Sequence, residues 1–177
     1  MPSNRATEIQ ALAMQALEAA MVLELKLSED ESSYTPQYVA AKLARVSRIQ
    51  EQLSDSQMML TKISLETTRQ TTELGILYHR QQSELKASET YKTTSRDQKT
   101  AWVENQLQAA HQTLKEWQHT HEVVSEVRTA VAERMKVMNR LDSDLRLHHR
   151  LLEGRHTPHG AMPTQMPPGN TQDIDLG

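Results

Sequence analysis

Residues 103–152 read VENQLQAAHQTLKEWQHTHEVVSEVRTAVAERMKVMNRLDSDLRLHHRLL. An apolar residue occurs at every seventh position of this stretch: Val103, Ala110, Trp117, Val124, Val131, Met138, Leu145 and Leu152. A strict seven-residue repeat keeps one face of a helix directed at a partner helix over a long distance. The stretch therefore predicts a long helix that packs in a coiled coil.

This repeat belongs to a longer segment, from Gln37 to Glu153, that contains no proline and a single glycine, Gly75. Proline and glycine are the residues that most often interrupt a helix, so their scarcity indicates extended helical structure. Gly154 and then Pro158 follow the repeat, and together they predict that the helix ends at Glu153.

Residues 36–88 predict a second long helix. Thr35 is suited to cap its start, and Pro36 occupies the first helical position, where its missing N–H is tolerated. The heptad positions of this helix are mostly apolar but become polar around Thr67 and Gln70. A polar layer in such a seam lowers stability but restricts register and partner choice. Pairs spaced four residues apart, such as Lys62–Glu66, mark its solvated faces.

The polar segment KASETYKTTSRD, residues 86–97, joins the two long helices. No glycine or proline forces a turn there, but Ser95 and Gln98 form a capping box for a new helix start. A continuous helix is the alternative to a turn, yet it would leave both seams without a partner in the chain. We therefore expect an antiparallel hairpin of helices 36–88 and 95–153.

The N-terminal segment, residues 1–28, predicts a shorter helix from about Asn4 to Leu27. It is rich in alanine, and its apolar residues surround most of the helix. Such a helix requires partners on more than one side, either the other two helices or another protein. The residues assigned to this packing and partner face are Leu12, Leu17, Met21 and Leu25.

Residues 155–177 are rich in proline and glycine and poor in apolar residues, which predicts a disordered tail. The predicted fold is therefore all-α. It is an elongated, rod-like three-helix bundle, made of an antiparallel coiled-coil hairpin with a short N-terminal helix and a disordered C-terminal tail. Ser28, in the acidic connection that follows the first helix, resembles a kinase target, although a plain acidic loop is the simpler interpretation.

Composition argues against several classes of function. Aromatic residues make up only 3% of the chain, with no phenylalanine, so a thick enzyme-like core is not expected. The net charge of −3 gives no electrostatic basis for binding nucleic acid. The absence of cysteine excludes disulfides and cysteine zinc sites and fits an intracellular, cytoplasmic protein. The most apolar window, residues 11–27, is too short and too charged to span a membrane.

No motif for catalysis or cofactor binding occurs in the sequence. Histidines gather at His148, His149, His156 and His159, but adjacent helical residues point in different directions and do not chelate one ion. We therefore expect no catalytic residue, no cofactor and no metal ion.

The sequence favours a non-enzymatic coiled-coil structural or adaptor protein that acts in a larger assembly through helix–helix contacts with other proteins. A second copy of the chain is one candidate partner. A small helical binding chaperone that shields a client, of the secretion or virion-assembly type, is the alternative, and a nucleic-acid-associated structural protein is a remoter one. The residues predicted to form the partner or packing seam are Leu12, Leu17, Met21, Leu25, Val103, Trp117, Val124, Val131, Met138, Leu145 and Leu152.

Overall fold

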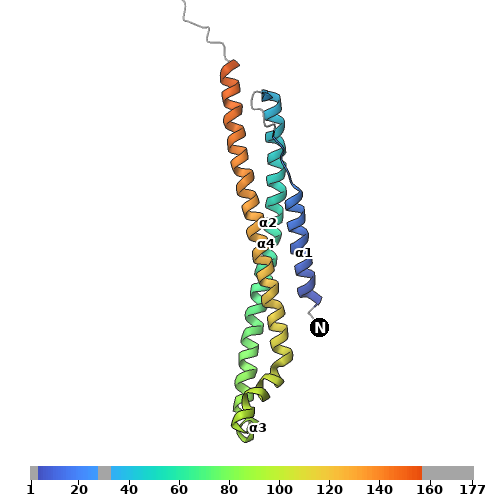
Figure 1. Cartoon of the computed structure of the whole chain (residues 1–177), viewed down its shortest axis with the longest axis vertical. Helices are drawn as coiled ribbons and strands as arrows, with labels where there is room; N and C mark the ends of the chain where they lie inside the picture. Colours follow the sequence, from blue (N-terminus) through green and yellow to red (C-terminus); the bar gives the residue numbers. More distant parts are fainter. Residues whose placement is uncertain (1–3, 28–32, 157–177) are drawn as a thin grey trace, which may run out of the picture.

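The computed structural model of the protein describes residues 4–27 and 33–156 (Figure 1). Its elements are α1 (Asn4–Val22), α2 (Pro36–Ala87), α3 (Glu89–Thr93), the 3-10 turn η2 (Arg96–Gln98) and α4 (Lys99–His156). The described ranges contain no strand, and the predicted all-α class is confirmed. The predictions for Ser28 and for the tail beyond residue 156 concern residues outside the described ranges.

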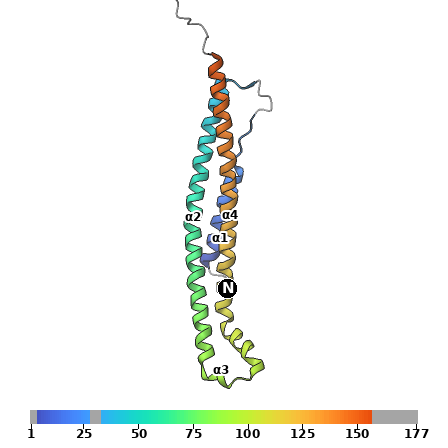
Figure 2. The same ribbon diagram turned by 90° about the vertical axis from the view of Figure 1, so that its left-hand side faces the viewer.

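Helices α2 and α4 form the predicted antiparallel hairpin, and α3 and η2 make its turn (Figures 1 and 2). Their opposite directions follow from the order of their contacts, since Gln50 bonds to Asn139 while Thr71 bonds to the carbonyl of Trp117. The two helices have 52 and 58 residues. At ~1.5 Å per residue, each extends roughly 80–90 Å, so the body is a narrow rod.

The hairpin is held together along the predicted heptad seam. The buried heptad residues of α4 are Val103, Trp117, Val124, Val131, Met138 and Leu145. They pack against α2, whose buried apolar residues are Val39, Val46, Ile49, Leu53, Leu60 and Ile63. Ala110 and Leu152 are half-buried.

Helix α1 lies beside the middle of the hairpin and runs parallel to α4 (Figures 1 and 2). Gln10 bonds to Thr120, and Leu23, directly after α1, bonds to Arg134. Residue numbers therefore increase in the same direction along α1 and α4. Three helices therefore share a core in the middle of the rod. Toward α3 the rod consists of α2 and α4 alone.

Helix α1 ends at Val22 rather than near Leu27 as predicted. Residues 23–27 are not helical, and the carbonyl groups of Leu23, Glu24 and Lys26 accept hydrogen bonds from cationic side chains of the hairpin. The three bonds are Arg134 to Leu23 at 2.6 Å, Arg45 to Glu24 at 3.4 Å, and Lys42 to Lys26 at 2.6 Å. These bonds satisfy backbone carbonyl groups that would otherwise pair within a continued helix, so the chain can leave the helix here.

The predicted start of α2 is confirmed. Thr35 is the N-cap, its hydroxyl accepts from the amide of Tyr38 at 3.1 Å, and Pro36 is the first helical residue. The helix ends at Ala87, and Ser88 caps α3 by accepting from the amide of Tyr91 at 3.2 Å.

Both predicted limits of α4 were wrong by a few residues. The regular helix begins at Lys99 rather than Ser95, because the Ser95 side chain makes no capping bond while its carbonyl accepts from the amides of Gln98 and Lys99 in a 3-10 turn. At the other end, α4 continues through Gly154 to His156. Glycine in a helix costs only about 1 kcal/mol relative to alanine, and this cost did not stop the helix.

Candidate interaction surface

The inner face of α1 is built almost entirely of small side chains. Its buried residues recur at intervals of three and four and are Ala6, Ile9, Ala13, Ala16 and Ala20. These residues belong to the same core cluster as Leu53, Leu60 and Val124 of the hairpin. Alanine allows the backbone of α1 to approach the hairpin closely, since its methyl group occupies little space.

Apart from Ile9, the larger apolar side chains of α1 lie at the edges of this contact or outside it. Leu12 is 38% exposed, Met14 44%, Met21 58% and Val22 79%. Leu17 and Leu25 are partly buried and pack against the core cluster. Of the four residues that the sequence assigned to the face of the first helix, Leu12 and Met21 are therefore exposed in part, and Leu17 and Leu25 are shared with the core.

Met14, Leu17 and Met21 form one strip on the side of α1 next to α4, and we call it the methionine strip. Gln10, which precedes this strip on the same face, donates a 2.9 Å hydrogen bond to the hydroxyl of Thr120 in α4. Leu12 lies on the opposite flank, in line with Arg5, which binds Glu66 of α2. Helix α1 thus presents apolar side chains on both sides of its buried face.

The seam residues of α4 serve packing within the chain. Val103, Trp117, Val124, Val131, Met138 and Leu145 are each at most 5% exposed, and Leu152 packs at the edge of a smaller cluster. That cluster lies at the end of the rod opposite α3 and contains Val39, Val46 and Leu145. These side chains are covered by α2, and in this conformation they offer no surface to another protein.

The polar layer expected near Thr67 lies inside the middle of the bundle. Thr67 is fully buried, donates to the carbonyl of Ser64 and lies 3.1 Å from Nδ1 of His121. Thr120, also fully buried, donates to the carbonyl of Glu116 and accepts from Gln10. Each buried hydroxyl is therefore hydrogen-bonded, as burial requires.

Arg5 and Glu66 clamp α1 to α2 through two parallel hydrogen bonds. Nε of Arg5 lies 2.9 Å from Oε1 of Glu66, and Nη2 lies 3.0 Å from Oε2. These bonds lower the pKa of Glu66 and raise the pKa of Arg5. The predicted partner of Glu66 was Lys62, but its carboxylate is engaged by Arg5 of the other helix.

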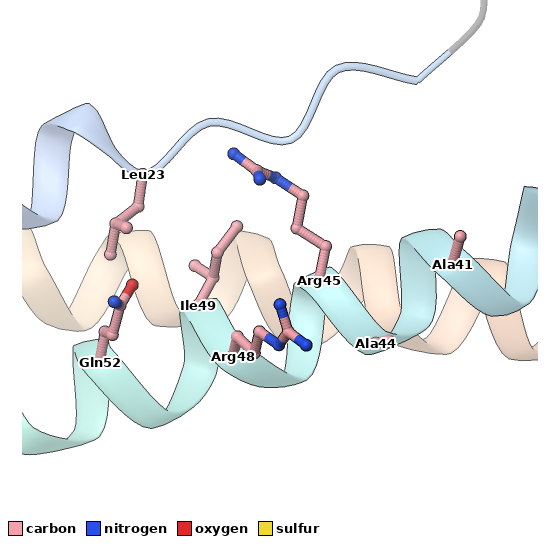
Figure 3. Close-up of a pocket in the computed structure, with 7 residues that line it drawn as sticks. All are labelled: Leu23, Ala41, Ala44, Arg45, Arg48, Ile49 and Gln52. Carbon is pink, nitrogen blue, oxygen red and sulfur yellow. The ribbon is translucent and has the colours of Figure 1, made fainter.

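A groove of about 550 Å³ lies between Leu23 and the outer turns of α2 (Figure 3). Leu23 points into it toward Gln52, and Arg45 reaches up toward the chain that leaves α1. Its lining residues are Leu23, Ala41, Ala44, Arg45, Arg48, Ile49 and Gln52. Its polar side chains are the guanidinium groups of Arg45 and Arg48 and the amide of Gln52. The lining contains no carboxylate, hydroxyl or imidazole, which are the groups that general acid–base and nucleophilic catalysis use.

His148 and His149 have other contacts near the end of α4. The ring of His148 meets that of Tyr34 edge-on at 5.4 Å, and Nδ1 of His149 lies 3.4 Å from a carboxylate oxygen of Glu153. Within the described part of the chain, no three histidine, aspartate or glutamate side chains are grouped so as to hold a metal ion. The side chains of His156 and His159 lie outside that part. None of the described helices is long and apolar enough to cross a membrane.

Comparisons with protein families, with curated proteins and with solved structures find no match to this chain.

Proposed function

We propose that the protein is a non-enzymatic structural or adaptor protein. In this proposal the α2–α4 hairpin is the support, and α1 presents apolar side chains to a helix of another protein. The observation that supports it is the orientation of α1, whose buried face is mostly alanine while Leu12, Met14 and Met21 are 38%, 44% and 58% exposed. A helix that served only to complete the core would be expected to bury its largest apolar residues.

The methionine strip has the properties of a surface for a partner helix. Its residues are spaced at three and four positions, the spacing that matches an amphipathic helix packed alongside. Methionine side chains are flexible and polarisable, so they adapt to the shape of a partner. Burying one apolar side chain of this size contributes about 1.5–3 kcal/mol, and a short strip therefore supplies useful affinity.

The support for such a surface is well ordered by internal bonds. The bidentate Arg5–Glu66 pair, the Gln10–Thr120 bond and the Arg134–Leu23 bond tie α1 to both long helices. Because α1 is held at its start, middle and end, its outer side chains keep a fixed arrangement. A preorganised surface binds a partner with less loss of conformational entropy.

Site-specific photo-crosslinking in native cells tests this proposal. A photoreactive residue in place of Met21 is expected to capture a defined protein, whereas one in place of Leu147, which is similarly exposed on α4, should not capture it. The partner is then purified and its affinity measured for the double variant Met14→Glu, Met21→Glu. We expect a loss of at least about tenfold, since two apolar contacts are removed.

The matched control for this measurement is Leu147→Glu, which is expected to keep the wild-type affinity. Circular dichroism should show the same helix content for all three proteins. Equal affinity of the double variant and the control would contradict the role of the methionine strip.

A binding chaperone is the second candidate, and the exposure of three methionines favours it: Met14, Met21 and Met58. An adaptable methionine surface suits clients of varied sequence. The two candidates differ in the state of the partner. An adaptor binds a folded partner at fixed stoichiometry, whereas a chaperone binds an unfolded client and suppresses its aggregation. Light scattering of the captured protein during refolding, with and without this chain, separates them.

A further inference from the structure

The two outer members of the methionine strip are methionines with exposed side chains. Met14 is 44% exposed and Met21 is 58% exposed. They are seven residues apart, so both lie on the same face of α1. Leu17, the residue between them in the strip, is partly buried against the core cluster and contains no sulfur. The strip therefore carries an accessible thioether at each of its ends.

The thioether of methionine is a target of peroxides, which convert it to methionine sulfoxide. The sulfur attacks one oxygen of the peroxide, the O–O bond breaks and an S–O bond forms. When the oxidant is hydrogen peroxide, the sulfur is oxidised by two electrons and the peroxide is reduced to water. The chain has no cysteine, so no thiol competes for this oxidant.

The other methionines of the described helices differ from the strip in exposure or in position. Met138 is 2% exposed within the core, and Met59 and Met135 are partly buried against the core cluster. Met58 is 57% exposed, but it belongs to α2. Because the oxidant must reach the sulfur, we expect the two strip methionines and Met58 to react before Met138.

Each added oxygen makes the strip more polar. A sulfoxide oxygen accepts hydrogen bonds and is hydrated in solvent, whereas a thioether is largely apolar. Covering that oxygen with the apolar face of another helix removes its water without replacing the hydrogen bond, which costs free energy. Oxidation at both ends of the strip therefore weakens the contact with a partner helix.

Oxidation of the strip leaves the contacts that hold α1 on the hairpin unchanged. The buried face of α1 consists of four alanines and Ile9, and it contains no methionine. The side-chain bonds from α1 to the long helices join Arg5 to Glu66 and Gln10 to Thr120, and these groups contain no sulfur. The oxidised chain therefore keeps its fold while the outer surface of α1 changes.

We propose that oxidation of Met14 and Met21 by a peroxide is a redox switch that releases the partner helix from the methionine strip. This inference rests on the proposed function, because it requires a partner on α1, and it adds the chemical signal that controls that contact. Methionine sulfoxide reductases return the sulfoxides to thioethers, so the release is reversible.

Limited oxidation of the purified full chain tests the order of reaction. The chain is treated with hydrogen peroxide, and peptide mass spectrometry follows the sulfoxide at each methionine. We expect Met14 and Met21 to be oxidised at least about tenfold faster than the buried Met138. Circular dichroism should show unchanged helix content when the strip has reacted. Equal rates at Met21 and Met138, or a loss of helix as the strip reacts, would overturn the proposal.

The affinity of the partner tests its release. The protein captured at Met21 is purified, and its Kd is measured for the untreated chain and for the oxidised chain after the peroxide has been removed. We expect oxidation to raise the Kd at least about tenfold, since two apolar contacts become polar. Because only this chain is treated, the change arises from its own side chains.

The double variant Met14→Leu, Met21→Leu is the matched control. Leucine has nearly the volume of methionine and forms no sulfoxide, so this variant should bind the partner as wild type does and keep its affinity after the same treatment. It retains all other methionines of the chain, including Met58. Loss of affinity by the oxidised double variant would assign the effect to other residues and overturn the switch.

The outcomes separate this inference from the proposed function. A captured partner that binds the oxidised and the untreated wild-type chain with the same Kd would overturn the switch and leave the proposed function intact. Failure of Met21 to capture any protein would overturn both.

Discussion

Nη2 of Arg134 donates a 2.6 Å hydrogen bond to the carbonyl of Leu23, the first residue after α1. The guanidinium is half-buried, and its Nε is buried without a hydrogen-bond partner among the described residues. The bond between a cation of α4 and a backbone carbonyl therefore fixes the point where the chain leaves its first helix.

Replacing Arg134 with Met keeps much of the packing of its stem but removes this donor. Hydrogen bonds that involve a charged group contribute about 1.5–3 kcal/mol. We expect a smaller loss in the free energy of unfolding, about 1–2 kcal/mol, because the substitution also removes the buried Nε. Urea unfolding followed by circular dichroism measures it, and proteolysis between residues 23 and 27 should accelerate. Arg140→Met, at an exposed position of α4, is the control. Equal stability of the two variants would contradict the role of the bond.

The alanine face of α1 predicts a sharp dependence on side-chain size. Ala13→Leu inserts bulk where the helix meets the hairpin and should destabilise the docking of α1 by about 1–3 kcal/mol. Ala11→Leu, at an exposed position of the same helix, should have little effect. Hydrogen exchange of the α1 amides measures the difference, while exchange in α2 and α4 should change far less. Fast exchange in both variants would show that size at Ala13 is not the determinant.

The partly buried Gln10–Thr120 bond is a polar link between α1 and α4. Thr120→Val removes the acceptor and should cost about 0.5–1.5 kcal/mol in unfolding free energy, the usual range for a neutral hydrogen bond. Thr129→Val is the matched control, since its hydroxyl bonds only to its own helix. A double-mutant cycle with Gln10→Ala isolates the pair, and a coupling energy indistinguishable from zero would exclude a contribution of this bond.

The Arg5–Glu66 clamp predicts acid sensitivity of the α1 contact. Hydrogen bonds from Arg5 lower the pKa of Glu66 in the folded protein, so the folded state binds its proton less readily than the unfolded state. The stabilisation is therefore complete above the ordinary glutamate pKa of about 4.3 and is lost as the pH falls through the lower folded value. NMR titration of the Glu66 carboxyl carbon in wild type and in Arg5→Gln measures it. The same midpoint in both proteins would be the contrary result.

The hairpin was predictable because its determinants are local or periodic. Thr35 and Pro36 specify the start of α2 within a few residues, and the repeat from Val103 to Leu152 specifies the seam of α4. The end of α1 at Val22 was not predictable, since it depends on carbonyl bonds to Arg45 and to Arg134, which lie far away in the sequence. Local hydrophobicity instead favoured continuation to Leu27.

The seam residues of α4 were assigned jointly to packing and to a partner, and the structure places them inside the hairpin. The orientation of α1 escaped prediction because hydrophobicity alone favours burying Leu12, whereas close helix packing favours Ala13.

The parallel docking of α1 on α4 has a consequence for synthesis on the ribosome. Gln10 must wait for Thr120, which is added 110 residues later. At about 5–20 residues per second this interval lasts roughly 5–20 s. During it α2 supplies only one wall of the site, so the alanine face and the methionine strip both remain uncovered on the nascent chain. Helix α1, which is the richest in apolar side chains, therefore docks late. The yield of folded protein depends on what shields α1 until translation reaches α4.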